Sequence, residues 1–220
     1  MRHDLKDFLR EIAPDIKNCT RCELASLYGS SLRARNLSLT IDNVPIDNVP
    51  IDKIRYVVLA ESPPKSTDFF YNIDSNGKQW LGNIVFPSFG LDMGDSPLVG
   101  DRKRKLLNDL LSMGVLMIDS CHCACNHLAE RGCPARKEEK RLRKDLVLSC
   151  YGRHTRHILD QILVSDPCVY VLPTFPGGYG WNIIKDLREL GFTKMNGEKR
   201  AELLPNWTRR QGLRYRSEQD

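Results

Sequence analysis

Short apolar runs alternate with amphipathic segments along this chain. The apolar runs are rich in β-branched residues and end at polar or turn-forming residues, a pattern that predicts buried strands. They are RYVVLA at 55–60, VLMID at 115–119 and CVYVLP at 168–173. Leucines and isoleucines recur at helical spacing between and after these runs, which predicts helices near 101–111, 137–164 and 181–192. The alternation favours an α/β fold of three layers (α/β/α) with a central, mostly parallel sheet.

The rest of the pattern bears on domain organisation and location. Segment 4–13 has helical spacing but lacks the apolar centre of a signal peptide, and no apolar run approaches the roughly 20 residues of a membrane span. The 220 residues are therefore expected to form one soluble, cytoplasmic domain, a monomer with no membrane partner. Segment 41–52, IDNVPIDNVPID, duplicates five residues, and its prolines indicate a surface connector.

Basic residues cluster more than the net charge of +5 suggests. The clusters are RKRK at 102–105, RKEEKRLRK at 136–144 and RRQGLRYR at 209–216, the last within a basic tail over 209–220. Clustered arginine and lysine suit contacts with nucleic-acid phosphates, so DNA is the expected partner. A solvated charged face is the alternative for each run.

Eight cysteines in a cytosolic chain favour metal ligands over disulfides. Cys19 and Cys22 form a CxxC pair, which presents two thiolates to one metal, and a distant pair can complete the set of four ligands. Cys121, Cys123, Cys125 and Cys133 all compete to be the third ligand. Cys168 begins an apolar run and is expected to be an inert buried thiol.

The segments that follow the predicted strands are ESPP, DSCHCACN and PTFPGGYG. In a parallel sheet these segments meet at one edge, where ligands bind. PGGYGW at 176–181 also precedes a helix whose first amides can hold a phosphate, although a tight glycine turn explains it equally well.

The order of these parts resembles the uracil-DNA glycosylase superfamily, and most closely its family-4 and family-5 branches, which hold a four-iron four-sulfur cluster. The motifs that carry the resemblance are CTRCELA at 19–25, VVLAESPP at 57–64, GKQWLG at 77–82, VLMIDSCHC at 115–123 and LVLSCYGRHTRHILDQI at 146–162. The resemblance implies a DNA glycosylase that flips a deaminated base out of DNA and removes it by hydrolysis.

The resemblance also implies roles for individual residues. A 4Fe-4S cluster would be held by four cysteines: Cys19, Cys22, Cys121 and Cys150, with Cys123 or Cys133 as alternatives to Cys121. A zinc site using Cys121, Cys123, His127 and Cys133 is a rival. Glu61 and Ser62 would handle the attacking water.

The same resemblance implies a base pocket. Trp80 would stack on the flipped base, with Phe70 and its neighbours Phe69 and Tyr71 as rivals. Asp119 or Asn126 would read the base edge, Asp119 being counted also among the catalytic candidates. The remaining expected substrate contacts are Ala60, Pro63 and Asn206. Each residue also has a structural explanation, as core packing for an aromatic or as a turn cap for a carboxylate.

Two departures from the family pattern keep other functions open. Ser62 stands where the superfamily carries a water-activating Asp or Asn, and LPNWTRR at 204–210 lacks the histidine of the C-terminal motif. The first alternative is therefore a catalytically inactive DNA-binding member of the fold. The second is a thiol redox or metal-handling protein that works through CHCAC, which predicts reactive thiols of low pKa.

Overall fold

A computed structural model of the chain describes residues 50–62, 70–77, 80–122, 136–172 and 180–195. These residues form an α/β fold around a parallel sheet of order β2-β1-β3, as the sequence pattern predicts. The strands are β1 (Tyr56–Ala60), β2 (Val115–Asp119) and β3 (Cys168–Val171). Each lies within a run that the sequence analysis assigned to a strand.

The central strand β1 is the most buried part of the sheet. Val57, Val58 and Leu59 are fully buried, since parallel neighbours lie on both sides and helices cover both faces. Tyr56 pairs with Val115 of β2 and with Cys168 of β3, so the three strands start in register. The strands therefore also end together, at one edge of the sheet.

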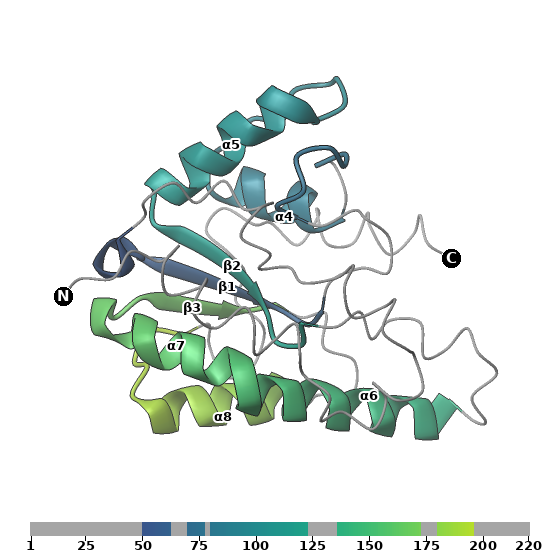
Figure 1. Cartoon of the computed structure of the whole chain (residues 1–220), viewed down its shortest axis with the longest axis vertical. Helices are drawn as coiled ribbons and strands as arrows, with labels where there is room; N and C mark the ends of the chain where they lie inside the picture. Colours follow the sequence, from purple (N-terminus) through teal and green to yellow (C-terminus); the bar gives the residue numbers. More distant parts are fainter. Residues whose placement is uncertain (1–49, 63–69, 78–79, 123–135, 173–179, 196–220) are drawn as a thin grey trace.

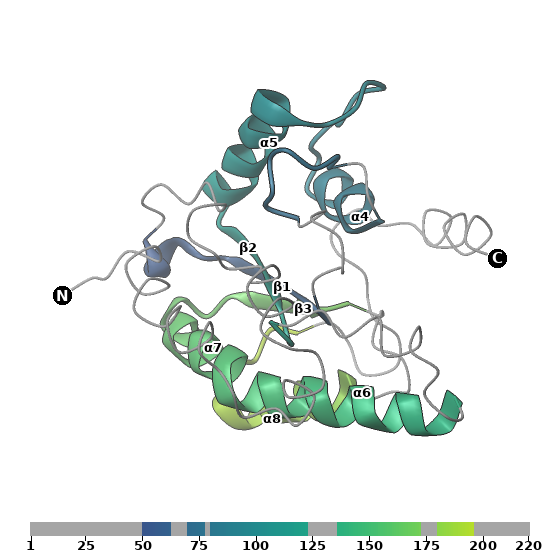
Figure 2. The same cartoon turned by 45° about the vertical axis from the view of Figure 1, so that its right-hand side comes forward.

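Helices cover the sheet on both faces, which gives the three layers expected from sequence (Figures 1 and 2). On one face lie α4 (Trp80–Ser88) and α5 (Gly100–Ser112). On the other face lie α6 (Arg136–Cys150), α7 (Arg156–Ile162) and α8 (Gly180–Leu190). The π turn η3 (Tyr151–Thr155) joins α6 to α7, and 3-10 turns lie at η1 (Ile51–Lys53) and η4 (Leu163–Ser165). Within the described segments, no helix combines the length and the apolar character that crossing a bilayer requires.

Two details differ from the sequence-based expectation. Helix α5 begins at Gly100, one residue before the predicted start, with Val99 as its N-cap and Asp101 in its first turn. Helix α4 falls in a segment for which the sequence pattern predicted no helix. Its residues are apolar on several sides and Pro87 lies near its end, so the segment lacks the periodicity and the stop signals that identify an amphipathic helix.

The turn between α5 and β2 requires glycine. Gly114 has φ of +77°, and a Cβ at this position would lie 2.3 Å from the carbonyl oxygen of Lys53. The Gly114 carbonyl in turn accepts hydrogen bonds from the amides of Arg55 and Tyr56, at 2.8 and 3.0 Å. This close approach sets where β1 and β2 begin.

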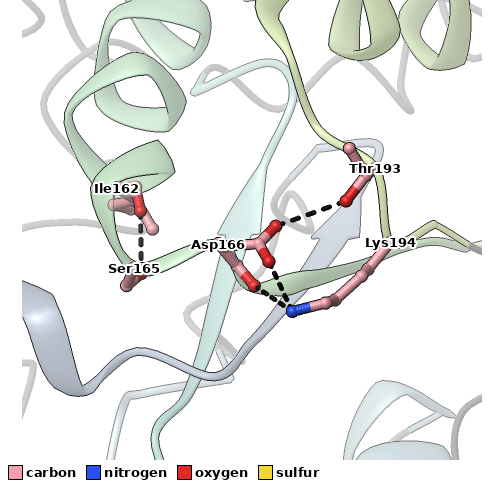
Figure 3. Close-up of polar contacts among 5 residues, drawn as sticks. All are labelled: Ile162, Ser165, Asp166, Thr193 and Lys194. Atoms are coloured by element: carbon pink, nitrogen blue, oxygen red, sulfur yellow. Dashed lines mark hydrogen bonds and ion pairs between the residues drawn. The ribbon is translucent and has the colours of Figure 1, made fainter.

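A polar cluster holds the chain beside β3 at its amino end (Figure 3). Asp166 has φ of +45°, and its carboxylate receives the Lys194 ammonium at 2.5 Å and the Thr193 hydroxyl at 3.5 Å. The carbonyl of Lys194 then accepts the amide of Val169 at 2.8 Å, and Met195 forms an isolated parallel bridge with Val169. The outer edge of β3 is therefore covered at this point.

The outer edge of β2 is covered by a side chain. The Tyr71 hydroxyl accepts the amide hydrogen of Met117 at 2.9 Å and donates to the carbonyl of Met117 at 3.2 Å. One hydroxyl thus makes both hydrogen bonds that a neighbouring strand would otherwise make. Burial, as the main cause, raises the pKa of Tyr71 above its usual value, so the hydroxyl stays protonated and able to donate.

We expect Tyr71→Phe to lower the free energy of unfolding by about 1–3 kcal/mol, because both backbone groups of Met117 would be buried without a partner. Urea denaturation monitored by circular dichroism measures the loss. Tyr56→Phe is the matched control, since the Tyr56 ring packs on Phe89 and its hydroxyl has no hydrogen-bond partner among the described residues. An equal effect of the two substitutions would contradict this role for the Tyr71 hydroxyl.

Candidate functional site

The loops after β1 and β2 run side by side beyond the strands. The amide of Ser120 donates to the carbonyl of Ala60, and the amide of Cys121 donates to the carbonyl of Glu61, each at 2.8 Å. Ala60 itself pairs with Asp119 in the sheet register. The candidates Ala60, Glu61 and Asp119 are therefore neighbours at the carboxyl edge, and all three are buried. Ser62, the next residue, is half-buried.

An arginine that the sequence analysis did not single out holds Glu61. The Nε of Arg143 lies 2.6 Å from Glu61 Oε1, and its Nη2 lies 2.5 Å from Oε2. The Glu61 side chain is 6% exposed and that of Arg143 is 20% exposed. The two side chains therefore form a largely buried, bidentate ion pair. Arg143 shares a helix face with the buried residues Leu146 and Val147. A cation on an apolar helix face is the sequence signal that could have identified it.

Two of the candidate metal ligands contact each other. Cys121 is fully buried beyond β2, and its side chain forms a hydrogen bond with that of Cys150 at the end of α6. The backbone amide of His122 also donates to Cys150 Sγ at 3.3 Å. The bond from Cys121 is the largest influence on the pKa of the Cys150 thiol, which lies below its usual value despite burial. The thiolate, the form that binds metals, is thereby favoured.

These contacts bear on which cysteines can share a metal. Cys121 and Cys150 could form half of a four-cysteine site, because their side chains are hydrogen-bonded to each other and Cys150 also receives a backbone amide. Among the residues that the structure describes, no three His, Cys, Asp or Glu side chains are grouped to hold a metal ion. Cys168 lies on β3 at the opposite edge, hydrogen-bonded to Tyr170.

A π turn brings Thr155 to the same edge as Cys150. The Thr155 hydroxyl lies 3.0 Å from the Asp119 carbonyl, 3.1 Å from the Ser120 carbonyl and 3.1 Å from His122 Nε2. Residues five apart in an α-helix lie about 140° from each other around the axis. The wider π turn between Tyr151 and Thr155 stacks such residues, so one continuous helix presents both side chains to the segment after β2.

His122 is buried within this polar cluster. A hydroxyl has one hydrogen, so donation by Thr155 to a carbonyl leaves its oxygen to accept from Nε2–H of His122 in the matching tautomer. The other ring nitrogen, Nδ1, has no hydrogen-bond partner within the described part of the chain, and neither has the Ser120 hydroxyl. Burial first, and the neighbouring His154 second, lower the pKa of His122 to about 3. The imidazole is therefore neutral at physiological pH.

The aromatic candidates beside this edge serve the core. Phe70 is 8% exposed, stacks on Phe86 at a centroid distance of 5.3 Å and meets Tyr71 edge-on. Tyr71 is bound to β2 as described above. Both rings are thus buried in the core. Trp80, the other stacking candidate, begins α4, and its side chain is not among those that the structure describes.

The basic run 102–105 is divided between surface and core. Lys103 is 1% exposed, and its ammonium group donates to the carbonyls of Asn72 and Ser75 and to the Ser75 hydroxyl, at 2.6, 3.2 and 3.0 Å. It fixes the turn that leads from Tyr71 to Gly77. Arg102, Arg104 and Lys105 are exposed, so within this run only these three remain candidates for phosphate contacts.

Several predicted residues lie outside the described residues. They are Pro63, Phe69, Asn126, Asn206, Cys19, Cys22, Cys123, Cys133 and His127, together with segment 41–49 and the tail 209–220. The sites that the structure does describe are thus the Glu61–Arg143 pair and the Cys121–Cys150 pair, with Asp119 beside them.

Comparisons with protein-family models, with curated proteins and with solved structures found no match. The function must therefore be argued from the chemistry of this edge and from the motifs along the sequence.

We expect Thr155→Val to lower the free energy of unfolding by about 1–3 kcal/mol, because the carbonyl that accepts from the hydroxyl and the His122 ring would each lose a buried partner. Thr155→Ser, which keeps the hydroxyl, is the matched control and should stay close to the wild type. Urea denaturation of the three proteins measures the difference. A loss of the same size in both variants would assign the effect to the methyl group instead.

Proposed function

We propose that this protein is a DNA glycosylase that removes a deaminated base, uracil or a related base, from DNA by base flipping and hydrolysis. The contact between Cys121 and Cys150 is the observation that carries the proposal. These are the residues that the superfamily resemblance assigns as the third and fourth cluster ligands, and they come from segments far apart in sequence. Support also comes from Glu61 and Asp119, which lie at the same sheet edge as that pair.

The proposed cofactor is a 4Fe-4S cluster held by Cys19, Cys22, Cys121 and Cys150. A structural cluster of this kind joins the N-terminal CxxC to the carboxyl edge of the sheet. The buried sulfur of Cys121 and the lowered pKa of the Cys150 thiol fit this use. Zinc bound by the same thiolates is the alternative.

The proposed pocket lies over the carboxyl ends of β1 and β2. Removal of a base requires an aromatic face for stacking, polar groups for the base edge and a positioned water molecule. Trp80 supplies the face, Asp119 or Asn126 reads the edge, and the loop of Glu61 and Ser62 positions the water. Ala60, Pro63 and Asn206 complete the contacts to the nucleotide.

DNA binding in this proposal depends on exposed basic residues. Arg102, Arg104 and Lys105 on α5 and Arg153 on η3 are exposed and are suited to contact phosphates. Affinity should then fall steeply with salt concentration, because each phosphate contact releases a counterion.

The activity is tested with oligonucleotides that carry uracil, hypoxanthine or xanthine, as single strands and as mismatched duplexes. Strand cleavage after alkali treatment reveals abasic sites. We expect product on at least one substrate and a rate roughly 10- to 100-fold lower for Trp80→Ala, since base stacking contributes about 1–3 kcal/mol. Val164→Ala, a change of an exposed residue on η4, is the control and should retain the wild-type rate. No product on any substrate from metal-loaded protein would refute the proposal.

The cofactor is tested by iron and sulfide analysis after anaerobic purification. Cys121→Ser and Cys150→Ser should each lose most of the bound iron, whereas Cys168→Ser should keep it because Cys168 lies at the opposite edge of the sheet. Zinc in place of iron would support the alternative metal. Retention of full metal content by both Cys121→Ser and Cys150→Ser would exclude this pair as ligands.

A catalytically inactive DNA-binding protein of the same fold is the second candidate. The observation that favours it is the Arg143 guanidinium, which binds both carboxylate oxygens of Glu61 and stabilises the charged form, so that Glu61 becomes a weaker general base. This candidate predicts salt-sensitive DNA binding without formation of abasic sites.

A further inference from the structure

Helix α6 is attached to the carboxyl edge of the sheet at two points. Arg143 binds Glu61 after β1, and Cys150 binds Cys121 after β2. Arg143 and Cys150 are at positions i and i+7 of one helix, so they lie on the same face about 10 Å apart. Leu146 and Val147, between them on that face, are buried in the core.

The sheet side of this attachment is also continuous. The amide of Cys121 donates to the carbonyl of Glu61 at 2.8 Å, so the residues held by the helix are bonded to each other. Glu61, Cys121, Cys150 and Arg143 therefore form a closed ring of contacts. A rigid helix segment with a packed face cannot move at one of its two attachments without straining the other.

The chemistry of the ion pair favours a positioning role for Arg143. A buried ion pair contributes little net stability, because desolvation of two charges offsets their attraction. It does fix geometry, since the guanidinium fork and the carboxylate make two parallel hydrogen bonds that lysine cannot reproduce. Both carboxylate oxygens of Glu61 are then held at 2.5–2.6 Å by the helix that ends in Cys150.

We propose that Arg143 is a positioning residue that couples the loop of Glu61 and Ser62 to the pair Cys121–Cys150. In this proposal Glu61 anchors the loop and does not act as a general base. The role of the loop in catalysis rests on the proposed function, whereas the structural coupling of the loop to the cysteine pair does not. A change at the cysteine pair, such as loss of a bound metal, is thereby transmitted to the candidate water-binding loop.

The structural coupling is tested by the alkylation rate of Cys150 in the full-length chain after metal removal. Iodoacetamide labelling and peptide mass spectrometry measure this rate. Arg143→Met should raise the rate about tenfold, in the range expected for coupled residues, and Arg143→Lys should raise it less. Arg141→Met is the matched control, because it removes the same charge from an exposed position on the same helix. It should leave the rate unchanged.

Cys168 on β3 serves as an internal reference in the same samples. A higher alkylation rate at Cys150 with an unchanged rate at Cys168 supports local structural coupling. An unchanged Cys150 rate in Arg143→Met would overturn the proposal. A parallel rise at both cysteines would overturn it too, since Arg143 would then act on the stability of the whole fold.

The anchoring role of Glu61 has a separate readout. The glutamine in Glu61→Gln keeps the shape of the side chain and still accepts one hydrogen bond from Arg143. The glycosylase activity of this variant should therefore stay within about tenfold of the wild type, and Arg143→Met should lose more activity. Loss of a general base instead lowers the rate about 10²- to 10⁴-fold. A loss of activity of that size in Glu61→Gln, with a smaller loss in Arg143→Met, would refute the anchoring role. If the wild type forms no product, the proposed function fails, while the labelling of Cys150 still tests the structural coupling.

Discussion

The architecture of the candidate site depends on the hydrogen bonds by which the β1–β2 pairing continues past the strands. The bonds from Ser120 to Ala60 and from Cys121 to Glu61 extend the parallel ladder by two residues into segments that would otherwise diverge as loops. Parallel pairing brings the ends of neighbouring strands to one edge, and this extension brings the next residues together as well. A carboxylate from one segment and a thiol from the other thus become neighbours.

The long helix on one face supplies the partners for these groups. Its α6 segment carries Arg143 and Cys150, and its π turn rotates Thr155 into contact with the same segment after β2. An uninterrupted α-helix would direct Thr155 away from Cys150. The π turn therefore gives one helix a third contact with the edge, in keeping with the frequent occurrence of such turns at functional sites.

Buried polar groups on the other face secure the remaining framework. The Tyr71 hydroxyl covers the outer edge of β2, and the Lys103 ammonium group holds the turn at Asn72 and Ser75. Both groups bind backbone atoms, so they fix main-chain positions as well as filling space. Residues 71–75 are thereby bound to β2 and to α5.

Local pattern alone was enough to predict the strands, the helices near 101–111, 137–164 and 181–192, and the α/β layering, because buried parallel strands and amphipathic helices each leave a distinct apolar period. It also placed Glu61 and Asp119 at one edge, since strand ends are visible in sequence. The pattern could not reveal α4, whose residues lack a single apolar face, or the inward direction of Lys103 within a basic run.

Only the tertiary structure decided the pairings. Glu61 with Arg143, Cys121 with Cys150 and Tyr71 with Met117 join residues separated by long stretches of sequence, and no local period encodes such distances. Helix rotation and the π turn set which side chains meet, and both depend on packing against the sheet. The sequence by itself thus determined the elements and the chemistry available at the edge, whereas packing selected the partners because a side chain's contacts depend on the whole fold.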